Sequence, residues 1–242
     1  MFDRRQSAMH QDRSQGSPLW DSLLAGEPRS IREPAAVPLW YRRNAGAWLP
    51  VDWPELICED RPSWESRSYL ALDLETTGLR SQMDRIIELA LVRFGFDAEG
   101  ALIESERLVT LVNPGIPIPL QASAIHGIRD EDVAHAPPFA SLAQDIASFV
   151  KGSILVAHNA MFDIGFLEVE LAREGLILPA DEAADTLGLA RAAFPDMLSY
   201  NLGKLAYQLH LPSDAGHRAL GDALTCMRLF AASMRMLTTR CD

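Results

Sequence analysis

The amino-acid sequence predicts an α/β protein, in which a mixed sheet flanked by helices follows an N-terminal extension rich in Trp and Pro. Composition changes near residue 66, because all five Trp lie before it and the later part alternates apolar segments with short polar turns. The run YLALDLET at 69–76 is apolar on both faces up to its acidic end, as expected for a central strand covered on both sides. Consecutive strands are then followed by alternating helices and strands, which is typical of a mixed sheet.

Apolar periodicity gives the order of the elements. The predicted elements are strands at 69–76, 86–96 and 102–112, a helical stretch at 121–134, helix 139–150, strand 153–158, helix 160–174, and helices near 186–194, 201–209 and 217–237. We therefore divide the chain into an extension, residues 1–65, and a domain, residues 66–242.

The extension has two recognisable segments. PLWDSLLAG predicts a short helix, and WYRRNAGAWLPV predicts a hairpin that turns at Asn44–Gly46. Two interpretations of its aromatic side chains stay open. They pack on the surface of the domain, or they dock a protein partner, as an amphipathic helix does in a groove.

Charge and cysteine usage exclude several classes of protein. A net charge of −11 argues against a broad basic surface for nucleic acid, so any such contact should be small and local. Cys58, Cys226 and Cys241 lack paired spacing, which suits a reducing cytoplasm better than a disulfide framework or a zinc site. The sequence shows neither a secretory signal nor an apolar run of membrane-spanning length. We expect a cytoplasmic protein without a membrane partner.

Acidic residues mark the end of the central strand. Asp73 and Glu75 are two residues apart, so both side chains lie on one face of the strand, at an edge where sites collect. Asp163 follows the strand ILVAH, in the first turns of a helix for which Asn159 is a suitable N-cap. Taken singly, each acid has a structural explanation, such as capping a turn or favouring a helix dipole.

A histidine and a further acid occur in GHRALGDALTCMRLF. His217 and Asp222 are five residues apart, about 140° on a helix, so they face one site only if His217 belongs to the loop before the helix. A satisfied structural Asp222 is the alternative. Together, Asp73, Glu75, Asp163 and Asp222 are the oxygen donors that Mg²⁺ and Mn²⁺ prefer, and four acids suit two ions. Such ions would separate and neutralise Asp73 and Glu75.

DLETTGL, HNAMFD and HRALGD, in this order, resemble the three motifs of the DnaQ-like (DEDDh) 3′–5′ exonucleases, including proofreading epsilon subunits and free-standing relatives. The similarity covers about residues 67–234 and also includes IIELALVRF, DTLGLAR and NLGKLA. It implies a ribonuclease H-like fold and two Mg²⁺ or Mn²⁺ ions held by the four acids. It further implies that His217 is the general base and that the product is a nucleoside 5′-monophosphate.

The resemblance also implies a binding site for the terminal nucleotide. His126 matches a family residue near that nucleotide, and Thr76 and Leu79 would line its slot. Gln121 stands where relatives often have an acid that reaches the 3′ hydroxyl. For both His126 and Gln121, a loop position without a ligand is the alternative.

The expected substrate is the 3′ end of nucleic acid, with single-stranded DNA favoured and a role in DNA replication or repair. An RNA-directed exonuclease, like oligoribonuclease or ribonuclease T, is the alternative within the same class. From another class, the chain could be a non-catalytic adaptor, although such a protein should have lost one of the acids or the histidine. The extension could dock a protein partner, form a homodimer or control access to the site.

Overall fold

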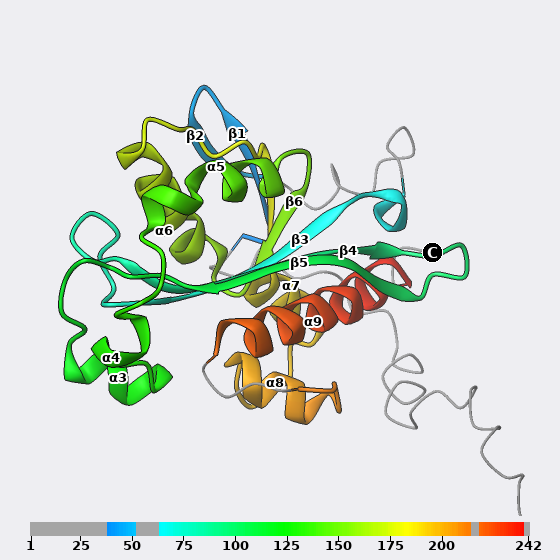
Figure 1. Cartoon of the computed structure of the whole chain (residues 1–242). Helices are drawn as coiled ribbons and strands as arrows, with labels where there is room; N and C mark the ends of the chain where they lie inside the picture. Colours follow the sequence, from blue (N-terminus) through cyan, green and yellow to red (C-terminus); the bar gives the residue numbers. More distant parts are fainter. Residues whose placement is uncertain (1–37, 52–62, 214–217, 240–242) are drawn as a thin grey trace, which may run out of the picture. The chain divides into compact units, whose positions relative to one another are not determined.

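The computed structural model describes residues 38–51, 63–213 and 218–239, all of which belong to one compact unit. Within them, seven strands form one sheet in the order β2-β1-β7-β6-β3-β4-β5 (Figure 1). The strands are β1 Trp40–Asn44, β2 Ala47–Pro50, β3 Tyr69–Thr76, β4 Ile86–Phe96, β5 Leu102–Leu111, β6 Ile154–Ala157 and β7 Glu182–Asp185. β3 pairs in parallel with β6, as β6 does with β7, whereas the β3–β4 and β4–β5 pairs are antiparallel. The predicted mixed sheet is therefore confirmed.

Helices cover both faces of this sheet (Figure 1). They are α3 Leu120–His126, α4 Asp130–Val133, α5 Phe139–Val150, α6 Ala160–Arg173, α7 Thr186–Ala193, α8 Leu202–Gln208 and α9 Ala219–Thr239, and a 3₁₀ turn, η1, spans Trp64–Ser66. Among the helices of the described ranges, none has the length and apolar character needed to cross a membrane.

The alternation of side chains along β3 decides which helices its residues meet. Leu70, Leu72 and Leu74 are buried in one core cluster with side chains of α5 and α6. On the opposite face, the ring centroid of Tyr69 lies 4.7 Å from that of Phe230 in α9. Asp73 and Glu75 lie an even number of residues after Tyr69 in the same strand, so their side chains point to the α9 face of the sheet.

Several predicted boundaries match the structure closely. The strands at 69–76 and 86–96 and the helix at 139–150 begin and end where predicted. The stretch at 121–134 is two short helices, separated where Gly127 adopts a left-handed conformation with φ of 75°. The last helix begins at Ala219, two residues later than predicted.

Strand β7 was not predicted. It has only four residues, Glu-Ala-Ala-Asp, and alanine has little preference for strands, so its sequence carries no strand signal. Pairing with β6 on one side and β1 on the other places Ala183 and Ala184 in the core.

The extension contributes two strands to the sheet. β1 and β2 form a hairpin whose connecting residues, Ala45 and Gly46, both have positive φ, as two-residue hairpin turns require. β1 also pairs antiparallel with β7, so residues 40–50 extend the same sheet as the domain. The helix predicted for PLWDSLLAG lies outside the described residues, and the division at residue 65 stays a prediction.

Candidate active site

Three of the predicted acids meet on the α9 face of the sheet. Asp73 and Glu75 end β3, and Asp222 lies in the first turn of α9. Each offers a carboxylate oxygen, and these three oxygens lie within 4.8 Å of one another. Carboxylate oxygens at this spacing fit a hard divalent cation such as Mg²⁺ or Mn²⁺.

Asp163 approaches the same strand from α6. Its side chain is buried, and its Oδ1 accepts a hydrogen bond from the backbone N–H of Leu74 at 3.2 Å. Asp163 is not one of the three clustered acids, but burial and then the charge of Asp163 raise the pKa of the Asp73 carboxyl. The structure therefore brings all four predicted acids to one end of β3.

The start of α6 is held by a carboxylate that the sequence did not single out. Asn159 occupies the N-cap position with φ of 68°, but its side chain makes no capping bond. Instead, Asp185 at the end of β7 accepts from the N–H groups of Asn159 and Ala160, both at 3.0 Å. The expected capping role of Asn159 is thus filled by Asp185, which fixes the helix that carries Asp163.

Burial, together with crowding, raises the pKa values of three of these carboxyl groups. Burial is the largest cause for Asp73, Asp163 and Glu75, and the charges of neighbouring acids add to it. The pKa of Glu75 reaches about 8, although the nearby Arg218 guanidinium opposes the rise. The site is therefore short of positive charge, and bound cations would supply it.

We expect the metal-free protein to lose stability as pH rises from about 5 to about 8. An unfolded Glu75 ionises near its ordinary pKa of 4.5, whereas folded Glu75 keeps its proton until about pH 8. The unfolded state thus releases protons first, and the stabilisation present at low pH disappears as pH passes through the folded pKa. Thermal melting in chelator should show this slope, and it should be shallower in Glu75→Gln. Parallel curves for the two proteins would contradict the prediction.

The predicted base, His217, lies outside the described residues. The residue after it, Arg218, is described, and its guanidinium pairs with the buried carboxylate of Glu88 in β4. The backbone carbonyl of Arg218 accepts from the N–H of Asp222 at 3.2 Å, so α9 begins directly after Arg218. Arg218 itself precedes α9, and the position of His217 stays a prediction.

The predicted nucleotide-binding residues differ in exposure. Thr76 is buried at the end of β3, where its hydroxyl donates to the carbonyl of Gly78 at 2.6 Å. Leu79 is 81% exposed and Gln121 is also exposed, so both side chains are accessible to a ligand. None of these three residues belongs to the acid cluster found among the described residues.

His126 is buried with one ring nitrogen already used. Nδ1 accepts from the N–H of Ile128 at 3.0 Å, whereas Nε2 has no hydrogen-bond partner in the described part of the chain. Burial lowers the pKa of His126, although the charge of Glu88 opposes that shift. A neutral ring whose Nδ1 accepts carries its proton on Nε2. A polar contact with the backbone of Thr76 also opposes the lowering of the pKa of His126, so this ring faces the end of β3.

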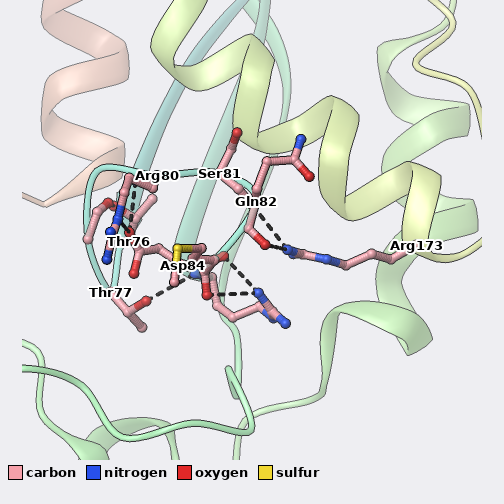
Figure 2. A network of polar contacts seen from close by, with 10 residues as sticks. Thr76, Thr77, Arg80, Ser81, Gln82, Asp84 and Arg173 are labelled. Atoms are coloured by element: carbon pink, nitrogen blue, oxygen red, sulfur yellow. Dashed lines mark hydrogen bonds and ion pairs between the residues drawn. The ribbon is translucent and has the colours of Figure 1, made fainter.

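The turn between β3 and β4 is held in place by side chains (Figure 2). Asp84 accepts from the N–H of Arg80 at 2.8 Å and closes the turn from within. Arg173, the last residue of α6, donates to the carbonyls of Ser81 and Gln82 at 3.1 and 2.9 Å. The two ends of α6 therefore contact the end of β3 and this turn, which carries Leu79.

Three further residues of the site were not predicted from the sequence, namely Glu88, Arg218 and Asp185. Each lies in a segment noted for its resemblance, IIELALVRF, HRALGD or DTLGLAR, but nothing in the segments indicates which side chains they contact. A buried acid in an apolar strand, as at Glu88, was the available signal, because such a group needs a partner.

Four acids at one end of β3, two from the strand and two from helices, offer only oxygen donors, which is typical of the divalent-metal site of a nuclease. The sequence model of the exonuclease family (RNase_T) matches residues 70–230. The chain belongs to this family, and the predicted relation to the DnaQ-like 3′–5′ exonucleases is confirmed.

Two curated relatives illustrate the match. The chain is 40% identical over 168 residues to the DNA polymerase III subunit epsilon of Treponema pallidum, covering 69% of this chain and 76% of that protein. It is 36% identical over 156 residues to the 3′–5′ exonuclease DinG of Bacillus subtilis, covering 64% of this chain. It spans only 16% of that second, much longer protein.

Solved structures show the same fold. Exonuclease X in complex with 5′ overhanging duplex DNA is 30% identical with a TM-score of 0.52, over 69% of this chain and 91% of that one. Escherichia coli exonuclease I in complex with a dT13 oligonucleotide is 21% identical with a TM-score of 0.59, over 72% of this chain and 41% of that one. The predicted ribonuclease H-like exonuclease fold is thus confirmed.

Proposed function

We propose that this protein removes nucleotides one at a time from the 3′ end of single-stranded DNA and releases nucleoside 5′-monophosphates. The observation that carries the proposal is the cluster of Asp73, Glu75 and Asp222, whose oxygens lie within 4.8 Å of one another. Family membership supplies the reaction class, and this cluster supplies the chemistry at the phosphodiester.

Asp73, Glu75, Asp163 and Asp222 would hold two divalent cations, Mg²⁺ or Mn²⁺. The raised pKa values of the first three carboxyls support this, because crowded buried acids stay ionised only if positive charge is added. When bound, such ions would supply Lewis-acid chemistry, activating the attacking water and stabilising the leaving 3′ oxygen.

The chain's own histidines would handle protons and orientation. His217 would take the proton from the attacking water, a role that suits an imidazole with a pKa near neutrality. His126 would donate its Nε2–H to the terminal nucleotide in place of its contact with the backbone of Thr76. Gln121 would reach the 3′ hydroxyl, and Thr76 and Leu79 would line the slot.

One observation favours a DNA end, and a second favours contact with only the terminus. Exonuclease X, at 30% identity, was solved with 5′ overhanging duplex DNA. The net charge of −11 suits an enzyme that grips only a frayed terminus, because binding many phosphates requires many cationic side chains. A single-stranded end is preferred because pairing must be broken to seat the terminal nucleotide.

The test is digestion of matched single-stranded DNA and RNA oligonucleotides labelled at the 5′ end, with Mg²⁺ or Mn²⁺ and with chelator. We expect a ladder that shortens from the 3′ end of DNA, a mononucleotide product, and no cutting in chelator or by His217→Ala. Faster shortening of RNA would replace the DNA proposal with the RNA-directed one. No cutting of either substrate by folded, metal-bound protein would favour a non-catalytic adaptor. Docking of a protein partner or a second copy on the extension stays a prediction.

A further inference from the structure

A fifth acid, Glu88, lies beside the four predicted ones. It belongs to β4 and stands directly opposite Glu75 in the β3–β4 register. Only 4% of Glu88 is exposed, and its charge raises the pKa values of both Asp73 and Glu75. An additional buried carboxylate next to the cluster is unfavourable unless it has strong partners of its own.

Both oxygens of Glu88 are occupied by the residues that begin α9. Arg218 donates from Nε to Oε1 and Oε2 at 3.1 and 3.0 Å, and from Nη2 to Oε1 at 2.6 Å. The backbone N–H of Ala219, the first residue of α9, donates to Oε2 at 3.0 Å. One carboxylate therefore binds a guanidinium and the first amide of the helix at once.

This contact lies one helical turn from Asp222. The N–H of Asp222 donates to the carbonyl of Arg218, so the position of Arg218 sets where Asp222 stands. The position of Glu75 is fixed separately, because β3, its strand, pairs with β4, the strand of Glu88. Glu88 and Arg218 thus join the two elements whose acids must share a cation.

We propose that Glu88 and Arg218 are positioning residues for this site. They fix the first turn of α9 against β4 and thereby hold Asp222 at its distance from Asp73 and Glu75. They also fix the chain immediately after position 217. This inference rests on the proposed function, since it concerns the ligand set of the same cations.

The principal variant is Glu88→Gln, which keeps the size of the side chain but loses its charge and one acceptor. Mn²⁺ affinity is measured by calorimetry, and kcat and KM are measured on a single-stranded DNA oligonucleotide. We expect Mn²⁺ affinity and kcat each to fall about 10–100-fold, the usual cost of losing a group that orients metal ligands. KM for the oligonucleotide should stay within about twofold, because neither residue contacts substrate in this proposal.

Arg218 provides a second variant that does not depend on a buried position, since its side chain is 56% exposed. Arg218→Lys keeps the charge but replaces the planar fork by a single ammonium, so the loss of Mn²⁺ affinity should have the same direction and be smaller. In Glu88→Gln/Arg218→Lys, the loss should be less than the product of the single losses, because both changes break one contact.

A matched control is Glu182→Gln. Glu182 also accepts from an arginine, Arg67 at 2.9 Å, and from a second donor, Trp40 Nε1 at 2.9 Å, but it begins β7 and is not one of the clustered acids. We expect Glu182→Gln to lower the melting temperature without changing Mn²⁺ affinity. This separates positioning of the site from general loss of stability.

Unchanged Mn²⁺ affinity in Glu88→Gln or Arg218→Lys would overturn the proposal. A rise in KM for Arg218→Lys that Glu88→Gln does not share would also overturn it, because Arg218 would then be a substrate contact. The proposed function fails separately, if the unaltered protein binds Mn²⁺ but cuts neither DNA nor RNA. In that case, the Mn²⁺ affinities of the variants still test whether Glu88 and Arg218 position the metal ligands.

Discussion

Asp73→Asn is expected to abolish exonuclease activity while making the metal-free protein more stable. Asp73 is clustered with Glu75 and Asp222, and loss of its charge removes a ligand shared by the proposed cations. Activity should fall at least about 1000-fold, because metal stabilisation of the transition state is worth several kcal/mol. The measurement is the initial rate of mononucleotide release from a single-stranded DNA oligonucleotide.

The gain in stability follows from the same crowding. Burial and the charges of Asp163 and Asp222 raise the pKa of Asp73, so its ionised form is unfavourable in the metal-free fold. An uncharged amide of the same size removes that repulsion. A gain of about 1 kcal/mol would raise Tm by about 2–4 °C in a chain of this size. Mn²⁺ should then raise the Tm of the unaltered protein more than that of the variant.

Asp145→Asn is a suitable control because Asp145 is exposed on α5 and is not one of the clustered acids. It should leave both rate and melting temperature unchanged. A variant Asp73→Asn that keeps more than about a tenth of the activity would show that the acids do not act through a shared cation. A less stable Asp73→Asn would show instead that Asp73 has a structural partner.

The motifs predicted which helices and strands meet at the site, but contacts between distant residues fix the positions of these helices. The pair Asp73 and Glu75 lies where the sequence placed it because strand alternation and the strand end are local properties. The start of α9 depends on Glu88, 131 residues away from Ala219, and the start of α6 depends on Asp185. No local pattern reports a partner at that separation.

The strands of the sheet show the same difference between local sequence signals and long-range contacts. β3 and β4 were predicted with their observed bounds because they are long and rich in apolar residues. β7 was missed because four residues with two alanines have no periodicity, and only its neighbours make it a strand. The hairpin at 40–50 was predicted from its turn, but its pairing with β7 could not be predicted once β7 was missing.

Trp40→Ala is expected to lower the free energy of unfolding by about 3–5 kcal/mol, the usual range for a buried Trp or Phe. Trp40 is 1% exposed, and its ring centroid lies 6.3 Å from that of Phe230 in α9. Its Nε1 donates to Glu182 at 2.9 Å, and Arg67 donates to the same carboxylate. The measurement is urea denaturation followed by circular dichroism, where an unchanged m-value would assign the shift to stability.

Trp48 in the same hairpin provides the matched control. It is only partly buried, its Nε1 donates to Glu168 at 2.9 Å, and the Arg43 guanidinium lies 4.8 Å from its ring centroid. Trp48→Ala removes one hydrogen bond, one cation–π contact and a partly buried contact with the core cluster, so it should cost less than Trp40→Ala, about 2 kcal/mol. Equal losses for the two variants would contradict a core role for Trp40.

Strand β7 connects Trp40 to the acids of the site. Trp40 pairs with Ala184, and the carbonyl of Leu39 accepts from the backbone N–H of Asp185 at 2.9 Å. Asp185 in turn caps the helix that carries Asp163. Loosening the hairpin is expected to lower the stability of the fold while the acid cluster still binds Mn²⁺, so Mn²⁺ should recover part of the lost stability because it binds only the folded protein. If Mn²⁺ stabilises Trp40→Ala no more than it stabilises Asp73→Asn, the hairpin is required for the geometry of the site as well as for the fold.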